Sequence, residues 1–177
     1  MSHPPIVVMG ISGCGKSTIG RSLALTLGAD FIDADDLHTV ANKTKMAIGT
    51  GLDDADRQPW LENVAHALTT RSIDGSAPVI ACSALTRAYR DILRVTAPLT
   101  FFAHLAGPVD VVEDRLRRRI HEFMSPSLLL SQAELLEPLE DDEIGVIADL
   151  RHTPAELVES FSAAVMAVHS MPSRELT

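Results

Sequence analysis

One short segment near the N-terminus constrains the fold of this 177-residue chain more than any other. The apolar run at residues 6–9 leads directly into GISGCGKS at residues 10–17, which fits the pattern G-x-x-x-x-G-K-[ST] at every fixed position. Glycines allow the tight turn that directs backbone N–H groups at phosphate oxygens, and the N-terminus of the following helix adds a partial positive charge. The segment therefore predicts a buried strand, a phosphate-binding loop and a helix, in that order.

The loop also supplies side chains that suit a nucleoside triphosphate. Lys16 can reach the β- and γ-phosphates, and the Ser17 hydroxyl can ligate Mg²⁺. Cys14 occupies a variable position of the motif, where we expect a small filler and not a redox centre. The residues predicted to contact the nucleotide here are Gly10, Ser12, Gly13, Cys14, Gly15, Lys16, Ser17 and Thr18.

Short apolar runs then alternate with amphipathic stretches along the rest of the chain. The runs lie at residues 31–32, 78–82, 99–105 and 146–150, and several are apolar at successive positions, as in strands buried on both faces. This alternation predicts a single three-layer α/β/α domain over residues 1–177, with a mostly parallel five-stranded sheet. Ligands of such sheets bind beyond the carboxyl ends of the strands.

Two helix boundaries can be predicted from local sequence. Ile19, Leu23 and Leu27 fall on one helical face, and Gly28 follows as a C-terminal stop. The segment TPAE at residues 153–156 combines a capping box with proline at the first helical position, so it predicts the start of the last helix.

A group of polar residues, DADDLH at residues 33–38, follows the second apolar run. Of its three carboxylates, Asp33 and Asp35 are the pair that can face the phosphate loop, and one can hold Mg²⁺ through water while the other accepts a proton from a substrate hydroxyl. The same pattern also suits a helix N-terminus, where the macrodipole favours acidic side chains. His38 is either a solvated helix residue or a substrate contact, and the residues alone leave both open.

The charge balance narrows the range of partners. With 15 Lys and Arg against 24 Asp and Glu, the net charge is −9 and the pI is near 5.1, which disfavours binding to nucleic acid or an anionic membrane. No apolar run reaches the ~18 residues that span a bilayer, and the N-terminus lacks the basic segment of a signal peptide. Two cysteines cannot form a disulfide framework. We therefore expect a cytoplasmic protein with a small-molecule substrate, and with no nucleic-acid or membrane partner.

Other classes of nucleotide-binding protein are disfavoured by missing motifs. A small GTPase needs N-K-x-D after a late strand, whereas Asn42-Lys43 comes early and is followed by Thr44-Lys45. Regulatory ATPases carry an acidic residue at the end of an apolar Walker B strand, and none of the later strands shows that pattern clearly. A non-enzymatic nucleotide switch stays open as an alternative, although it gives no reason for an acidic pair placed to meet a hydroxyl acceptor.

With these residues identified, the chain resembles the gluconokinase family of small P-loop kinases. Besides the phosphate loop and the segment at 31–38, LDDADRQPWL at 52–61 is similar to the family's L-x-D-x-D-R-x-P-W-L. CSALTRAYRDILR at 82–94 is similar to its C-S-A-L-x-x-x-Y-R-D-x-L-R. Residues 123–138 resemble the lid segment, with Glu122 where the family commonly has His and Ala133 where it has Phe. A shikimate kinase is the alternative within the same fold, but that family carries a glycine triplet where this chain has CSAL at 82–85.

The resemblance implies a P-loop kinase fold with a helical lid at about residues 117–138. It also implies ATP-dependent phosphorylation of D-gluconate at the 6-hydroxyl, with ATP and Mg²⁺ as cofactors and a homodimer as the assembly. The Ser17 hydroxyl would ligate Mg²⁺ directly, and Asp33 would contact the ion through a water ligand. The residues expected to carry the chemistry are Lys16, Asp33, Asp35 and Arg119.

The resemblance also implies where the two substrates bind. Because gluconate is an anion, Arg57 or Arg90 would grip its carboxylate in a bidentate fork. The predicted substrate contacts are Asp35, His38, Arg57, Ser83 and Arg90. Arg115 and Arg119 would reach the nucleotide phosphates from the base of the lid, and adenine would lie between that base and residues 151–154.

Overall fold

Five parallel strands form the centre of the structure, a computed structural model that describes residues 3–48, 50–72, 75–117 and 126–169. They are β1 (Ile6–Met9), β2 (Phe31–Asp33), β3 (Val79–Ala81), β4 (Phe101–Ala106) and β5 (Gly145–Asp149). The strand order is β2-β3-β1-β4-β5, and every neighbouring pair is parallel. The predicted five-stranded sheet is confirmed, and β1, which leads into the phosphate loop, occupies its central position.

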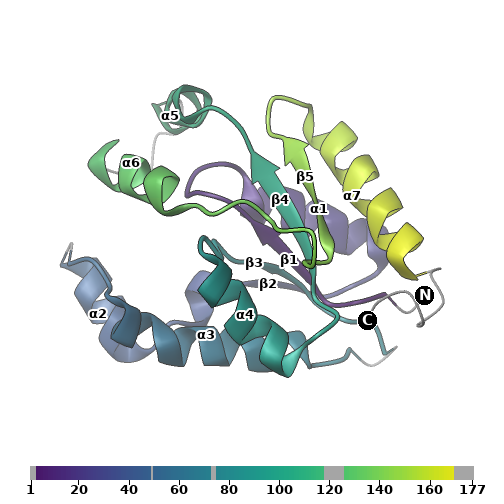
Figure 1. Cartoon of the computed structure of the whole chain (residues 1–177), viewed down its shortest axis with the longest axis horizontal. Helices are drawn as coiled ribbons and strands as arrows, with labels where there is room; N and C mark the ends of the chain where they lie inside the picture. The colour runs from purple at the N-terminus through teal and green to yellow at the C-terminus, as the bar shows by residue number, and fades with distance from the viewer. Residues whose placement is uncertain (1–2, 49, 73–74, 118–125, 170–177) are drawn as a thin grey trace.

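Helices cover both faces of this sheet, as Figure 1 shows. They are α1 (Lys16–Leu27), α2 (Val40–Ala47), α3 (Asp54–Leu68), α4 (Arg87–Thr96), α5 (Val109–Arg117), α6 (Pro126–Leu135) and α7 (Pro154–His169), with a short 3-10 helix η1 (Ala34–Leu37). α1 and α7 pack on one face, and α3 and α4 pack on the other, which confirms the three-layer architecture. α5 and α6 lie together beyond the end of β4. Within the described ranges, no helix combines the length and the apolar character that crossing a membrane requires.

Successive side chains of a strand point to opposite faces of the sheet, so they belong to two separate hydrophobic cores. Ile6 and Val8 of β1 pack with residues of α1 and α7, whereas Val7 and Met9 point to the opposite face, toward α3 and α4. All four side chains are fully buried. A strand buried on both faces must be apolar at every position, which is why the apolar runs show no alternation.

The helix boundaries predicted from local sequence are confirmed. α1 ends at Gly28, which has a left-handed conformation with φ 65°. At the start of α7 the Glu156 backbone N–H donates to Thr153 Oγ1 (3.3 Å), and the Thr153 N–H donates to Glu156 Oε2 (2.8 Å). α3 begins with an equivalent box between Asp53 and Asp56, which the sequence analysis did not identify.

Candidate active site

The phosphate loop joins β1 to α1 at the centre of the sheet. Gly10 has φ 138°, and a Cβ atom there would lie 2.7 Å from the Leu105 carbonyl oxygen. Gly13 has φ 80°, and a Cβ atom there would lie 2.8 Å from the side chain of Leu116 in α5. Both positions therefore require glycine for conformation and for space. The loop owes its shape to contacts with β4 and α5 as well as to its own sequence.

Two side chains of the loop differ in their accessibility. Lys16 is half-buried, and its Nζ donates to the Ile11 carbonyl oxygen at 3.1 Å. Cys14 is buried, and its Sγ lies where a Cβ atom on Gly10 would come within 2.9 Å. Burial raises the pKa of the Cys14 thiol although Lys16 opposes this. The structure thus gives Cys14 the packing position of a filler.

The acidic pair lies next to the start of α1. Ser17 Oγ donates to Asp33 Oδ2 at 2.7 Å, so the predicted metal-binding hydroxyl and carboxylate are in direct contact. Asp33 Oδ1 also accepts from the Asp35 N–H (3.2 Å) as the N-cap of η1. Asp33 is therefore both a helix cap and a partner of Ser17. The Asp35 side chain is exposed at the same strand end.

The oxygen atoms of Ser17 and Asp33 are the hard donors that suit Mg²⁺. Among the residues that the structure describes, no group of three or more His, Cys, Asp or Glu side chains is arranged to hold a metal ion. This donor set fits an ion that keeps waters and takes its other ligands from nucleotide phosphates, as Mg²⁺ usually does.

His38 is held by aromatic stacking. Its ring stacks on that of Trp60 in α3, with centroids 4.4 Å apart and an interplanar angle of 12°. The Trp60 indole N–H in turn donates to the Ala34 carbonyl oxygen at 2.7 Å. Burial lowers the pKa of His38, which the Asp35 carboxylate partly counters. His38 is therefore a positioned, neutral imidazole near Asp35, and not a freely solvated side chain.

α2 is tied to α3 by a charged contact that the sequence analysis missed. Lys45 Nζ donates to both carboxylate oxygens of Asp56, at 2.6 and 2.7 Å. Asn42, which is buried, donates to the Asp56 carbonyl oxygen at 2.7 Å and lies 3.4 Å from His38 Nδ1. Together these contacts fix the wall of the site that carries His38.

Arg57, in the first turn of α3, keeps part of its guanidinium accessible. Its side chain is 30% exposed, and its Nη1 donates to the Tyr89 hydroxyl at 3.1 Å and to Asp54 Oδ1 at 3.4 Å. The Tyr89 hydroxyl donates to the same Asp54 oxygen at 2.6 Å. Within the described residues Nε and Nη2 of Arg57 donate to no protein acceptor, so one edge of the fork is available to a ligand.

The structure corrects the prediction for Arg90. Its side chain has no exposed surface, and its fork pairs with Glu143, which is equally buried, through Nε–Oε1 (2.6 Å) and Nη2–Oε2 (2.8 Å). The remaining donors point to backbone carbonyl oxygens of Ala84, Leu85, Glu137 and Pro138. Arg90 therefore has no donor left for a substrate, and it fastens residues 137–143 to the loop after β3.

That loop lies directly beside the phosphate loop. The Ser83 carbonyl oxygen accepts from the Gly10 N–H at 3.3 Å, and Ser83 is half-buried. The next residue, Ala84, has φ 44°, a left-handed conformation that is unusual for a residue with a Cβ atom. Cys82 is fully buried, which raises the pKa of its thiol to about 12. Ser83 therefore lies beside the phosphate loop, while Cys82 has no reactive thiolate.

Arg115 reaches the phosphate loop from α5. Its guanidinium donates to the Cys14 carbonyl oxygen at 3.2 Å and to the Leu150 carbonyl oxygen, joining the loop to the end of β5.

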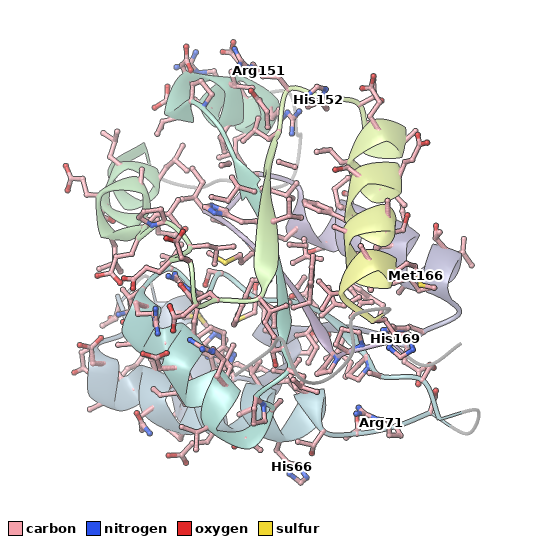
Figure 2. The ribbon with its side chains drawn as sticks, turned by 45° about the vertical axis from the view of Figure 1, so that its right-hand side comes forward. His66, Arg71, Arg151, His152, Met166 and His169 are labelled. Atoms are coloured by element: carbon pink, nitrogen blue, oxygen red, sulfur yellow. The ribbon has the colours of Figure 1, made fainter. Side chains whose placement is uncertain are left out.

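Arg119 lies outside the described residues. Figure 2 shows Arg151 and His152 at the turn between β5 and α7, where adenine was predicted to bind. Arg151 pairs there with Asp149.

Comparison with known proteins agrees with this arrangement. A family model for shikimate kinase matches residues 12–148. The thermosensitive gluconokinase of Escherichia coli (strain K12) is 40% identical over 169 residues, covering 95% of this chain and 90% of that protein. A gluconokinase of Arabidopsis thaliana is 43% identical over 152 residues, covering 78% of this chain and 80% of that one. The crystal structure of a gluconokinase from Sinorhizobium meliloti 1021 has a TM-score of 0.85 and 39% identity, with 93% of each chain covered. The chain belongs to the gluconokinase family.

Membership of the gluconokinase family, within the shikimate kinase-like P-loop kinases, makes this chain a kinase that uses ATP. Trp60 and Tyr89 lie in the sequence blocks that carried the family resemblance, but the sequence alone predicted no role for either of them. The structure gives each a contact, since Trp60 supports His38 and Tyr89 supports Arg57. Glu143 was missed because nothing in its local sequence marks it as the partner of an arginine 53 positions earlier.

Proposed function

We propose that this member of the gluconokinase family transfers the γ-phosphoryl group of ATP to the 6-hydroxyl of D-gluconate, giving 6-phospho-D-gluconate and ADP. The observation that carries the proposal is the 40% identity to a gluconokinase over 95% of the chain. The site supports it, because the hydrogen bond from the Gly10 N–H to the Ser83 carbonyl oxygen holds the loop after β3 against the phosphate loop. Phosphoryl transfer is largely a matter of positioning and charge neutralisation, so this adjacency is what the reaction needs.

On the nucleotide side, the backbone N–H groups of the loop and the Lys16 ammonium bind the phosphates, and Thr18, exposed at the start of α1, adds a hydroxyl. Ser17 and Asp33 would hold Mg²⁺, which would supply positive charge against the triphosphate. Arg115 contributes from the base of the lid, and Arg119 from the lid itself. The lid at about residues 117–138 excludes water that would otherwise take the phosphoryl group.

On the acceptor side, Asp35 orients the gluconate hydroxyl and accepts its proton. Its carboxylate is exposed and lies two positions after Asp33, the last residue of β2. Arg57 binds the gluconate carboxylate with the free edge of its guanidinium. His38 and Ser83 bind hydroxyl groups along the sugar-acid chain. The neutral imidazole of His38 suits this role, since one ring nitrogen donates and the other accepts.

The roles of the two carboxylates can be separated by substitution. Asp35→Asn should lower kcat by roughly 10²-fold, as expected on loss of a positioned base, and should leave the Kd of MgATP nearly unchanged. Asp33→Asn should weaken MgATP binding as well as turnover, because the side chain that accepts from Ser17 loses the negative charge that favours Mg²⁺. The reverse pattern would exchange the two roles. Unchanged turnover in both variants would reduce the pair to the cap of η1.

The test of the proposed function is ADP release by the purified protein with ATP and Mg²⁺, with and without gluconate. Gluconate-dependent release, abolished in Lys16→Ala, supports the proposal. Release that depends on shikimate instead would identify the other kinase of this fold. ATP binding with no acceptor-dependent turnover would favour a nucleotide switch. The homodimer and the cytoplasmic location stay predictions, and light scattering of the purified protein checks the first.

A further inference from the structure

Three consecutive residues of the phosphate loop are contacted from α5 and α6. Leu116 packs against Gly13, and Arg115 donates to the Cys14 carbonyl oxygen. The third contact comes from Gln132 of α6, whose Oε1 accepts from the Ser12 N–H at 2.8 Å across 120 positions of sequence. An N–H group is only a donor, so the side-chain oxygen is the atom that faces it.

The Ser12 N–H belongs to the same peptide unit as the Ile11 carbonyl group. That carbonyl oxygen accepts from Lys16 Nζ at 3.1 Å. In a trans peptide the C=O and N–H groups point in opposite directions, and the described residues contain no cis bond. Gln132 and Lys16 therefore hold one peptide plane from its two sides. Hydrogen bonds in such a series polarise one another, which strengthens both.

The chemistry of a glutamine suits this place. Its amide offers an acceptor to the loop without adding a negative charge beside the phosphates, which a carboxylate would do. Gln132 is half-buried, and α6 is anchored in the core by Leu129, which is 1% exposed. The acceptor is thus presented from a packed helix and not from a free surface side chain.

We propose that Gln132 is a positioning residue for phosphoryl transfer. By accepting from the Ser12 N–H it fixes the orientation of the Ile11 carbonyl group, and through that group the position of the Lys16 ammonium against the β- and γ-phosphates. It thereby makes the docking of α6 a condition for full activity. The inference rests on the phosphoryl transfer proposed above, and it assigns to this lid helix a contact with the loop itself.

The test compares Gln132→Met, which keeps the length of the side chain and loses the amide acceptor, with Glu134→Ala, a matched change at an exposed position of the same helix. Gln132→Met should lower kcat by about tenfold, with the gluconate KM within twofold and the melting temperature unchanged. Glu134→Ala should match the parent in all three. Gln132→Glu retains an acceptor, so at saturating ATP its kcat should return to within about threefold of the parent, while its KM for ATP rises.

A second measurement asks whether Gln132 acts through Lys16. Binding of a non-hydrolysable ATP analogue, which needs no gluconate, should weaken about fivefold in Gln132→Met, the size of one hydrogen bond. In a Lys16→Ala background the same substitution should change the affinity by less than twofold. An equal loss in both backgrounds, or a Gln132→Met enzyme with the parent's kcat, would overturn the inference. Because analogue binding is independent of the acceptor, failure of the gluconate assay would leave this result interpretable.

Discussion

Arg57 and Arg90 carry the same prediction from sequence, yet the structure places them in opposite surroundings. Arg57 keeps 30% of its side chain exposed and uses one nitrogen on Tyr89 and Asp54. Arg90 is fully buried, and all three nitrogens of its guanidinium donate to Glu143 or to backbone carbonyl oxygens. A guanidinium can bind a ligand only with donors that the fold leaves unused. Counting those donors separates a substrate-binding arginine from one that holds the site together.

The two arginines also contribute differently to the construction of the site. Arg90 draws residues 137–143 onto the loop that contains Ala84, whose strained backbone it stabilises through the Ala84 carbonyl oxygen. Arg57 instead lies at the start of a helix whose capping box, between Asp53 and Asp56, fixes its direction. Arg90 thus maintains the shape of the site, whereas Arg57 keeps donors that a ligand in the site can reach.

The largest effect should follow the removal of Arg90. Arg90→Met removes the bidentate partner of the buried Glu143 carboxylate, which keeps only the Glu140 N–H at 3.0 Å and an Arg87 nitrogen at 3.8 Å. The substitution should therefore reduce the free energy of unfolding by about 3–5 kcal/mol. Urea unfolding measures this, and Glu143→Gln should destabilise in the same direction if the first variant does not fold. If the Arg90→Met protein were as stable as the parent and only its gluconate KM rose, Arg90 would be a substrate-binding residue and the distinction from Arg57 would be wrong.

Arg57→Ala should show the complementary behaviour. Loss of a charge-assisted contact to the gluconate carboxylate should cost about 2 kcal/mol or more, which is a rise in gluconate KM of about 30-fold or more. The KM for ATP and the unfolding free energy should change little, since a surface substitution usually shifts stability by about 0.5 kcal/mol or less. Collapse of ATP binding with normal gluconate binding would move Arg57 to the nucleotide site.

The buried imidazole of His104, which lies near Arg90, should be visible in the pH dependence of stability. His104 is 3% exposed, neither ring nitrogen has a partner within the described residues, and burial together with Arg90 lowers its pKa from 6.5 to about 4. Below pH 6.5 the unfolded chain binds a proton that the folded protein does not. His104 therefore costs no stability above pH 6.5. Below that pH it lowers the free energy of unfolding by about 1.4 kcal/mol per pH unit, down to about pH 4.

Substituting His104 by leucine should remove that part of the acid slope of the unfolding free energy. His66 provides the control, because it is exposed on α3 and points into solvent in Figure 2. His66→Gln is the matched substitution of an exposed histidine against which the slope of His104→Leu is compared. An identical slope in the parent and in His104→Leu would show that His104 does not titrate differently on folding.

The smallest effect is expected at Tyr89, which sharpens the description of Arg57. Tyr89→Phe removes the hydroxyl that accepts from Arg57 and donates to Asp54, while the ring remains. Losing this support should raise the gluconate KM about fivefold, with kcat and the KM for ATP unchanged. Equal rises in both Michaelis constants would assign Tyr89 to the general architecture of the site.

The features that could be predicted from sequence depend on local physics. The phosphate loop, the Gly28 stop and the Thr153 capping box each depend on residues within a few positions of one another. The Asp53 box was equally local and could have been found by the same rule. By contrast, the partners Arg90 and Glu143 are 53 positions apart, and Ser12 and Gln132 are 120 apart. Only the fold brings such pairs together, so a motif alone assigned Arg90 to the wrong task.

The proposed reaction places a phosphoryl group on the terminal hydroxyl of gluconate. The most direct measurement is NMR of the product formed from ATP and ¹³C-labelled gluconate by the purified protein. We expect one phosphorylated product with ³¹P–¹³C coupling to carbon 6, and none with Lys16→Ala. A phosphate on another carbon, or labelled gluconate recovered unchanged while ATP is bound, would contradict it.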